Sequence, residues 1–190
     1  MNTIRPVIKW WAVAVLILSA ALLPSCSVPV MPKNIPLVKE AQEVSLSGVS
    51  VIVTNAEKDA VEHDILTDKE QESGLRGSRQ AWSGKLVETL ARELARRGAR
   101  VSSTASLTLS VALPGITFVQ TRELYQIKVK VAVSSSSVWS KEYEGLAGVS
   151  VSSVWTITEA TDQLAGRALA GAVKAMLEDP EFLAQLPAQK

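Results

Sequence analysis

Alternation between apolar and polar side chains from Leu124 to Val133 is the feature that most constrains how this chain folds. Isoleucine and valine occupy every second position from residue 127 onward, and Lys128 and Lys130 lie between them. Because successive side chains of a strand point to opposite faces, this stretch is expected to form a strand with one buried face and one face open to water. The chain therefore needs a sheet that another layer covers on one side only.

Three further stretches carry strand patterns. Alternation predicts strands over residues 45–55 and 100–113, and the dipeptide Pro114-Gly115 predicts a turn at the end of the second. Residues 138–146 follow a run of serines at 134–137, so we expect them to return as the hairpin partner of the 124–133 strand. Residues 56–77 are charged and keep no regular period, which predicts a long loop.

Two amphipathic stretches supply the covering layer. The first, residues 78–97, carries apolar side chains at every fourth position, at Trp82, Leu86, Leu90 and Leu94. Ser78 is suited to cap the start of this helix, and Gly98 is suited to end it. The second, residues 156–177, is rich in alanine and glycine and stops before Asp179-Pro180. A short terminal turn containing Phe182 is expected to fold back after it.

The order of these elements, β-α-β-β-β-α, predicts an α+β fold. We expect a two-layer sandwich in which a mainly antiparallel sheet carries two helices packed on one face. The other face of the sheet is then left for solvent or a partner. A chain of 190 residues has room for one such domain, which we place over residues 44–190, after an N-terminal leader and a tether.

The first 25 residues have the composition of a signal peptide. Arg5 and Lys9 give a basic start, and fourteen apolar or small residues follow before Pro24. A helix that spans a bilayer needs about 20 apolar residues, so this run is short for a permanent membrane span. Export is therefore the favoured interpretation of residues 1–25.

Cys26, the only cysteine, follows this run directly. Leu23, Ser25 and Cys26 resemble the lipobox of bacterial lipoproteins, whereas Pro24 departs from its pattern. The resemblance implies that Cys26 is lipidated, becomes the first residue of the mature protein and holds it on a membrane through acyl chains such as palmitate. Ser27, in place of an aspartate, favours the periplasmic face of the outer membrane. Ordinary cleavage at the same small residues, which would release a soluble protein, is the alternative.

Residues 26–43 are expected to link the lipid to the domain. Pro29, Pro32 and Pro36 exclude a regular helix or a central strand there. A semi-extended chain of this length could hold the domain up to about 50 Å from the lipid. The sequence therefore predicts a proline-rich tether.

The sequence contains no recognisable catalytic constellation. His63 is the only histidine, and no serine lies in a Gly-x-Ser-x-Gly elbow. Acidic residues surround this histidine, at Glu57, Asp59, Glu62 and Asp64. Their spacing matches no calcium-binding loop, and Gly74-x-x-Gly77 lacks the ending of a phosphate-binding loop. We therefore expect no enzyme activity, no cofactor and no metal. The 20 basic and 19 acidic residues give no net field that would attract nucleic acid.

Five residues are candidates for a partner-binding face: Tyr125, Lys128, Lys130, Trp139 and Tyr143. Aromatic side chains that stay exposed on a sheet often mark such a face, and membership of the core is the competing interpretation. The two lysines lie on the polar side of their strand. There they contact water or meet an anionic glycan or lipid headgroup.

The order of these features resembles a known family. The features are the leader with Cys26, the proline-rich segment, the strand at Gly48-Val49-Ser50-Val51, the helix ending at Arg97-Gly98, the 125–133 strand and the closing helix. Together they resemble the YajG-like family of uncharacterised bacterial lipoproteins over most of the mature chain. The resemblance implies no catalytic residue.

These observations predict a non-enzymatic outer-membrane lipoprotein that binds or braces another envelope component, a protein or a lipid, through the open sheet face. The alternative is an auxiliary lipoprotein of an ABC-type lipid-transport system, which would hold an acyl ligand in an apolar groove between helices and sheet, or deliver it to a transporter. A hydrolase is disfavoured because His63 has no second histidine or free cysteine beside it.

Overall fold

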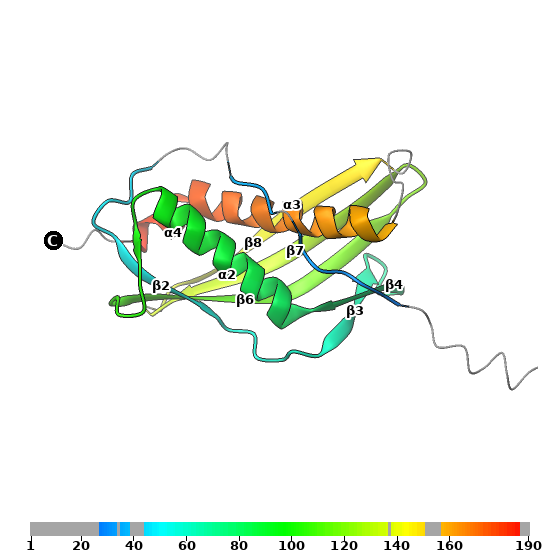
Figure 1. Cartoon of the computed structure of the whole chain (residues 1–190), viewed down its shortest axis with the longest axis horizontal. Helices are drawn as coiled ribbons and strands as arrows, with labels where there is room; N and C mark the ends of the chain where they lie inside the picture. The colour runs from blue at the N-terminus through cyan, green and yellow to red at the C-terminus, as the bar shows by residue number, and fades with distance from the viewer. Residues whose placement is uncertain (1–26, 34, 39–43, 137, 151–156, 187–190) are drawn as a thin grey trace, which may run out of the picture.

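A single curved sheet runs through the described part of the chain and bends around two long helices (Figure 1). This computed structural model describes residues 27–33, 35–38, 44–136, 138–150 and 157–186. The predicted signal peptide and Cys26 lie outside these ranges, as does residue 156, at which the second helix was predicted to begin.

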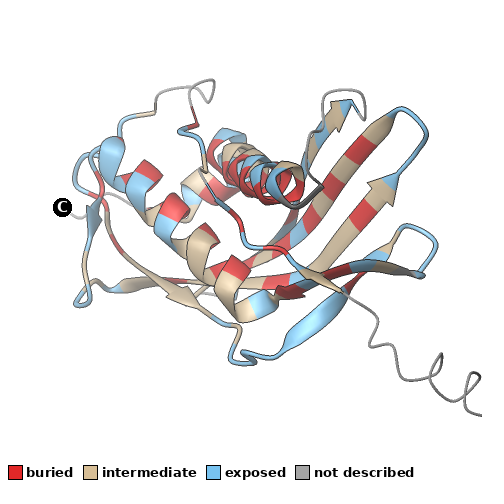
Figure 2. Ribbon diagram, turned by 45° about the vertical axis from the view of Figure 1, so that its right-hand side comes forward, coloured by how far each residue is buried: buried red, intermediate tan, exposed pale blue. Residues whose placement is uncertain are grey.

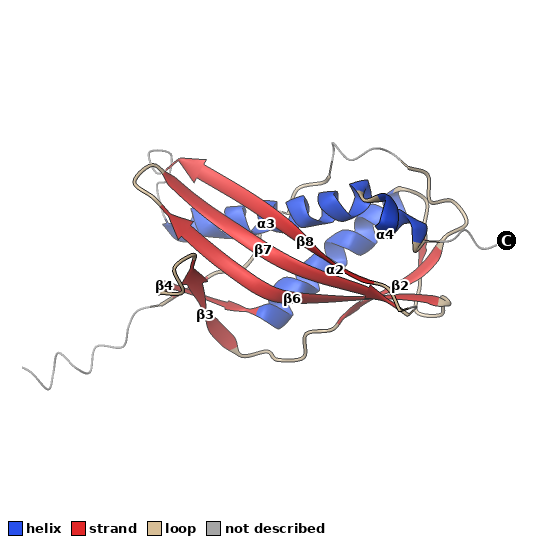
Figure 3. Ribbon diagram, turned by 180° about the vertical axis from the view of Figure 1, so that it is seen from behind, coloured by secondary structure: helices blue, strands red, loops and turns tan. Residues whose placement is uncertain are grey.

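Eight strands and three helices make up this part. The strands are β1 (Val28–Pro29), β2 (Ser50–Asn55), β3 (Glu62–Thr67), β4 (Glu72–Ser78), β5 (Arg100–Val101), β6 (Leu107–Gln120), β7 (Leu124–Ser135) and β8 (Ser140–Ser150). The helices are α2 (Arg79–Arg96), α3 (Ile157–Glu178) and α4 (Pro180–Ala184). The α+β class is confirmed, and both long helices cover one face of the sheet (Figure 3).

The three longest strands form an antiparallel meander. β7 pairs with β6 on one side and with β8 on the other, and Val131 lies opposite Tyr143 in the second pairing. Ile127, Val129, Val131 and Val133 are fully buried toward the helices. The half-buried strand and its hairpin partner, predicted from alternation, are therefore both confirmed.

The other edge of β6 adds short parallel pairings to a sheet whose longest pairings are antiparallel, as predicted. β2 runs parallel to the first half of β6, and β3 runs parallel to the second half. The turn predicted at Pro114-Gly115 is wrong, because β6 continues through both residues and shifts register there. A proline cannot donate a ladder hydrogen bond, and a bulge is one of the few places in a sheet that accept it.

The long loop predicted over residues 56–77 is also wrong, because β3 and β4 form an antiparallel hairpin there. Ile65 and Leu75 are buried, whereas most other side chains of this hairpin are exposed. Because Ile65 and Leu75 are the only large apolar side chains on the buried side of the hairpin, its strands carry too little apolar alternation for a sequence pattern to detect. Gly77 lies directly against the indole of Trp82, so the hairpin packs on the start of α2.

The two predicted helices are confirmed. Ser78 caps α2 by accepting a hydrogen bond from the Ala81 backbone N–H at 3.2 Å. Gly98 follows that helix with a φ of 94°, a conformation that glycine adopts without strain. The short terminal turn is confirmed as α4, which Asp179 caps and in which Phe182 is fully buried.

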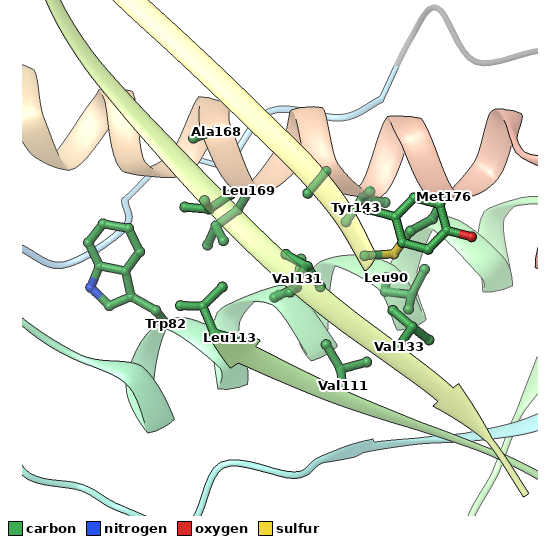
Figure 4. Close-up of a cluster of buried hydrophobic side chains, with 14 of the residues drawn as sticks. Trp82, Leu90, Val111, Leu113, Val131, Val133, Tyr143, Ala168, Leu169 and Met176 are labelled. Atoms are coloured by element: carbon green, nitrogen blue, oxygen red, sulfur yellow. The ribbon is translucent and has the colours of Figure 1, made fainter. Parts of the chain in front are cut away.

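The core lies between the sheet and the helices (Figure 2). Leu90 of α2 and Leu169 and Met176 of α3 meet Leu113 and Val131 of the sheet, and all five are fully buried (Figure 4). α3 approaches β8 closely at Gly145. A side chain there would place its first carbon 1.9 Å from the backbone oxygen of Ala168.

Candidate functional site

The helices leave the outer face of β6, β7 and β8 uncovered in the described residues (Figure 3). Side chains that alternate with the core residues point to it. They are mostly small or polar, and include Ser110, Ala112, Thr117, Gln126, Lys128, Lys130, Ala132, Glu142 and Glu144. We call this surface the open face. It offers hydrogen-bonding groups and charges of both signs on the convex side of the curved sheet.

Charged side chains gather at the middle of the open face. The Lys128 ammonium lies 2.9 Å from a carboxylate oxygen of Glu144 on the neighbouring strand. Lys130 lies opposite Gly115, and its aliphatic stem extends over that glycine. Leu146 of β8 lies opposite Lys128 of β7, and 58% of the surface of this leucine is exposed. The middle of the open face therefore combines charges of both signs with one exposed apolar side chain.

The five residues predicted for a partner-binding face do not share one face. Lys128 and Lys130 are on the open face, whereas Tyr125 and Tyr143 are buried on the helix side. Tyr125 stacks on Phe118, with ring centroids 5.8 Å apart. Trp139, which is half-buried, packs against the core near Phe182. Alternation along β7 places Tyr125 with Ile127 and Val129, so core membership is the correct interpretation for that tyrosine.

Tyr143 belongs to a polar cluster that fastens α4 to β8. Its hydroxyl donates a hydrogen bond of 2.5 Å to Asp179, and the Lys141 ammonium lies 3.0 Å from the same carboxylate oxygen. Burial, followed by the bond to Asp179, raises the pKa of Tyr143 well above its usual value. Burial opposes ionisation of Asp179, but the hydrogen bonds from Tyr143 and Lys141 outweigh it and lower the pKa of that carboxyl. The Asp179 carboxylate is ionised and is held by Tyr143, Lys141 and the Glu181 backbone N–H, which stabilises the attachment of α4 to β8.

The proline-rich segment before residue 44 packs on the domain rather than standing clear of it. Val28 and Pro29 form β1, which pairs with β4 in parallel. The next carbonyl, that of Val30, accepts a hydrogen bond of 2.9 Å from the indole N–H of Trp82. Val30 and Val38 are both buried in the core cluster. We call residues 28–38 the N-terminal strap, with residue 34 outside the described part.

Two buried acids hold the strap. Asp162 of α3 accepts a hydrogen bond of 2.8 Å from the Met31 backbone N–H, and its other oxygen lies 2.7 Å from the Lys33 ammonium. Glu93 of α2, fully buried, accepts a bond from the Val38 backbone N–H at 3.2 Å. Prolines keep the strap extended, and its unpaired backbone groups are satisfied by these side chains. The predicted free tether therefore does not describe these residues.

Sequence reasoning missed both acids, although one of them carried a visible signal. Glu93 falls between Leu90 and Leu94 on the apolar stripe of its helix, where a charged residue needs a partner. An acid on a buried stripe can therefore point to a segment that docks against the helix. Asp162 lies in the second turn of α3, where the alanine- and glycine-rich sequence marks the buried side of the helix less clearly, so its role could not be read from position alone.

The acidic stretch around His63 remains on the surface. His63 Nε2 lies 3.1 Å from a carboxylate oxygen of Asp59, and both side chains are about half exposed. The Val61 backbone N–H and then His63 donate to Asp59 and lower its pKa. Within the described ranges, three or more histidine, cysteine or acidic side chains nowhere gather in a way that could hold a metal ion.

A hollow of about 230 Å³ lies at the C-terminal end of α2, lined by Val44, Ser45, Arg96 and Arg97. The helix–sheet interface, by contrast, is filled by fully buried side chains such as Leu86, Leu90 and Leu113. Among the described residues, no helix is long and apolar enough to cross a membrane.

The fold and its open face define a small α+β domain with one covered and one uncovered sheet surface. No protein-family model matches the sequence. No curated protein matches it either.

Solved structures give low similarity. The chain is similar to protein XCC0632 from Xanthomonas campestris, a DUF330 protein, with a TM-score of 0.47 and 15% identity over 80% of this chain and 89% of that chain. A protein from Caulobacter crescentus CB15, provisionally described as a lipoprotein, gives a TM-score of 0.46 and 16% identity over 77% of this chain and 98% of that chain. A PelC dodecamer from Paraburkholderia phytofirmans gives a TM-score of 0.27 and 13% identity over 79% of this chain and 96% of that chain. These likenesses carry no conclusion about what this chain does, and the resemblance to the YajG-like family stays a prediction.

Proposed function

We propose that this protein is a lipid-anchored lipoprotein on the periplasmic face of the bacterial outer membrane and that it binds another envelope component through the open face. The observation that carries the proposal is the division of the sheet. Both long helices and the strap cover one side, while β6, β7 and β8 leave their other side uncovered in the described residues. The apolar run that ends at Cys26 supports the anchor.

The chemistry of the open face suits a protein or a headgroup rather than a reaction. Lys128, Lys130, Glu142 and Glu144 place both charge signs within one patch, which favours specific polar contacts over general attraction to anions. His63 is exposed and paired with Asp59, and no serine of the sequence lies in a Gly-x-Ser-x-Gly elbow. We therefore propose a non-enzymatic binding role.

An auxiliary lipid-transport role has less support. It requires an apolar groove between helices and sheet, and fully buried side chains fill the described part of that interface. A bound acyl chain would have to displace Leu86, Leu90 or Leu113, each of which makes close contacts in the core.

The anchor is tested by replacing Cys26 with alanine and fractionating the cell envelope. We expect Cys26→Ala to leave the outer-membrane fraction and to lose the mass of the acyl chains, because no thiol remains to carry them. Ser27→Ala is the matched control and should stay with the membrane. If Cys26→Ala still fractionates with the outer membrane and keeps its mobility, the anchor proposal is wrong.

The binding face is tested by a photo-reactive amino acid placed in the full chain in intact cells. At Lys130, on the open face, we expect a reproducible crosslink to one envelope component. The control position is Glu88 on the outer surface of α2, where 67% of the side chain is exposed. A crosslink from position 88 that equals or exceeds that from position 130 would contradict a role for the open face.

A further inference from the structure

The strap fixes which end of the molecule can face a membrane, and we infer that this is the end formed by the β3–β4 turn (68–71) and the β6–β7 turn (121–123). The inference rests on the lipid anchor proposed at Cys26. Val28 is already a strand residue paired with Leu75. Two peptide units span at most about 7 Å, so an acyl chain on Cys26 is tied within that reach of Val28.

The strand directions identify the end. β1 is parallel to β4, so the chain before Val28 points back toward the start of β4 and the β3–β4 turn. β3 in turn runs parallel to β6, with Thr67 opposite Phe118, so β3 and β6 end side by side. Figure 3 shows both turns at the same end of the sheet, opposite to α4. We call this the anchor end.

The strap cannot act as a long spacer while it is docked. Trp82 holds the Val30 carbonyl, Asp162 holds the backbone of Met31 and the ammonium of Lys33, and Glu93 holds the backbone of Val38. These contacts follow directly after β1 and join it to both long helices. The lipid is therefore attached to the folded body itself, and the body takes a restricted orientation on the bilayer.

Charge at the anchor end does not by itself attract a membrane. The β3–β4 turn carries Asp68, Lys69 and Glu70, and the other turn carries Arg122 and Glu123. This near-balance gives no basic cluster for anionic headgroups, so the orientation depends on the anchor and not on the lipid charge. Val138, which is fully exposed, lies at the opposite end of the sheet. The fourteen residues of β6 separate the two ends of the sheet by about 45 Å.

The orientation is measured on lipidated full-length protein reconstituted in phosphatidylcholine vesicles. Since the native cysteine carries the lipid, Gln71→Cys or Val138→Cys provides one thiol for a fluorophore, and nitroxide on the lipid headgroups quenches it by proximity. Both positions are exposed. We expect quenching several-fold stronger at position 71 than at position 138, with Arg122→Cys behaving like position 71. Adding anionic lipid should leave this ratio unchanged.

A flexible Gly/Ser linker of about 15 residues, inserted between Ser27 and Val28, keeps the strap docked but frees the body, because its r.m.s. span is roughly 20 Å. The difference between positions 71 and 138 should then collapse. Equal or reversed quenching in the unmodified chain overturns the inference while leaving the anchor intact, and so does a linker variant that keeps the full difference. Protein that does not float with the vesicles and carries no acyl mass refutes the proposed anchor, and the inference with it.

Discussion

The two faces of the β6–β8 meander are made from the same strands but differ in burial and in the chemistry of their side chains. On the covered face, Val129, Val131 and Val133 are fully buried against α2 and α3. On the open face, their neighbours Lys128 and Lys130 keep contact with water. Substitutions on the covered face should therefore change the free energy of unfolding, whereas substitutions on the open face should change binding and leave folding intact.

The largest effect is expected where the covered face meets backbone. In Gly145→Ala, the added carbon would lie 1.9 Å from the Ala168 carbonyl oxygen and 2.7 Å from the Ala172 nitrogen, so α3 must move away from β8. We expect a loss of about 3 kcal/mol or more in the free energy of unfolding, measured by urea denaturation.

Gly148→Ala, on the open face of the same strand, is the matched control. Its added carbon meets only side chains, Gln126 at 3.2 Å and Leu124 at 3.5 Å, so we expect a change below about 1 kcal/mol. Similar losses at positions 145 and 148 would show that the two faces do not differ in the way proposed.

A smaller effect, with a pH dependence, is expected at the edge of the covered face. Because the pKa of Tyr143 is raised in the folded protein, the unfolded chain releases the phenolic proton first as the pH rises above 10. The stability that Tyr143 contributes is therefore complete below pH 10 and is lost above it.

Tyr143→Phe tests this behaviour. At neutral pH it should lower the free energy of unfolding by about 2 kcal/mol, because the hydrogen bond to Asp179 is lost. The difference from the unmodified protein should shrink as the pH rises above 10. Tyr125→Phe, which leaves the Asp179 cluster intact, should keep the alkaline loss, and a constant difference between Tyr143→Phe and the unmodified protein across pH would contradict the assignment.

Sequence patterns predicted those elements whose burial is periodic along the chain. β7, its hairpin with β8 and the two long helices each have one continuous buried side, so alternation or a stripe marks them directly. The β3–β4 hairpin was missed because its buried side carries only two large apolar side chains, Ile65 and Leu75. The predicted strand ended too early, at residue 113, because proline usually ends a strand. Only the pairing with the neighbouring strand shows that β6 continues past Pro114 through a bulge.

The candidate site divides in the same way. Side chains alternate between the two faces along β7, which places Lys128 and Lys130 on the open face. The same alternation could have assigned Tyr125 to the core. The strap could not be predicted, because its burial depends on a surface built from α2 and α3, which lie far along the chain. An extended proline-rich segment has the same sequence pattern whether it is docked or free.

The smallest effect on stability, and the most informative one for function, is expected at the Lys128–Glu144 pair on the open face. Both side chains are partly exposed, so Lys128→Gln should change the free energy of unfolding by less than about 1 kcal/mol. If the open face binds a partner through this charged patch, the same substitution should lower the crosslink yield from position 130 several-fold. Lys85→Gln, which removes a comparable pair with Glu88 on α2, is the control for both measurements. An unchanged crosslink yield in Lys128→Gln would exclude the charged patch from the contact and move the binding surface elsewhere on the sheet.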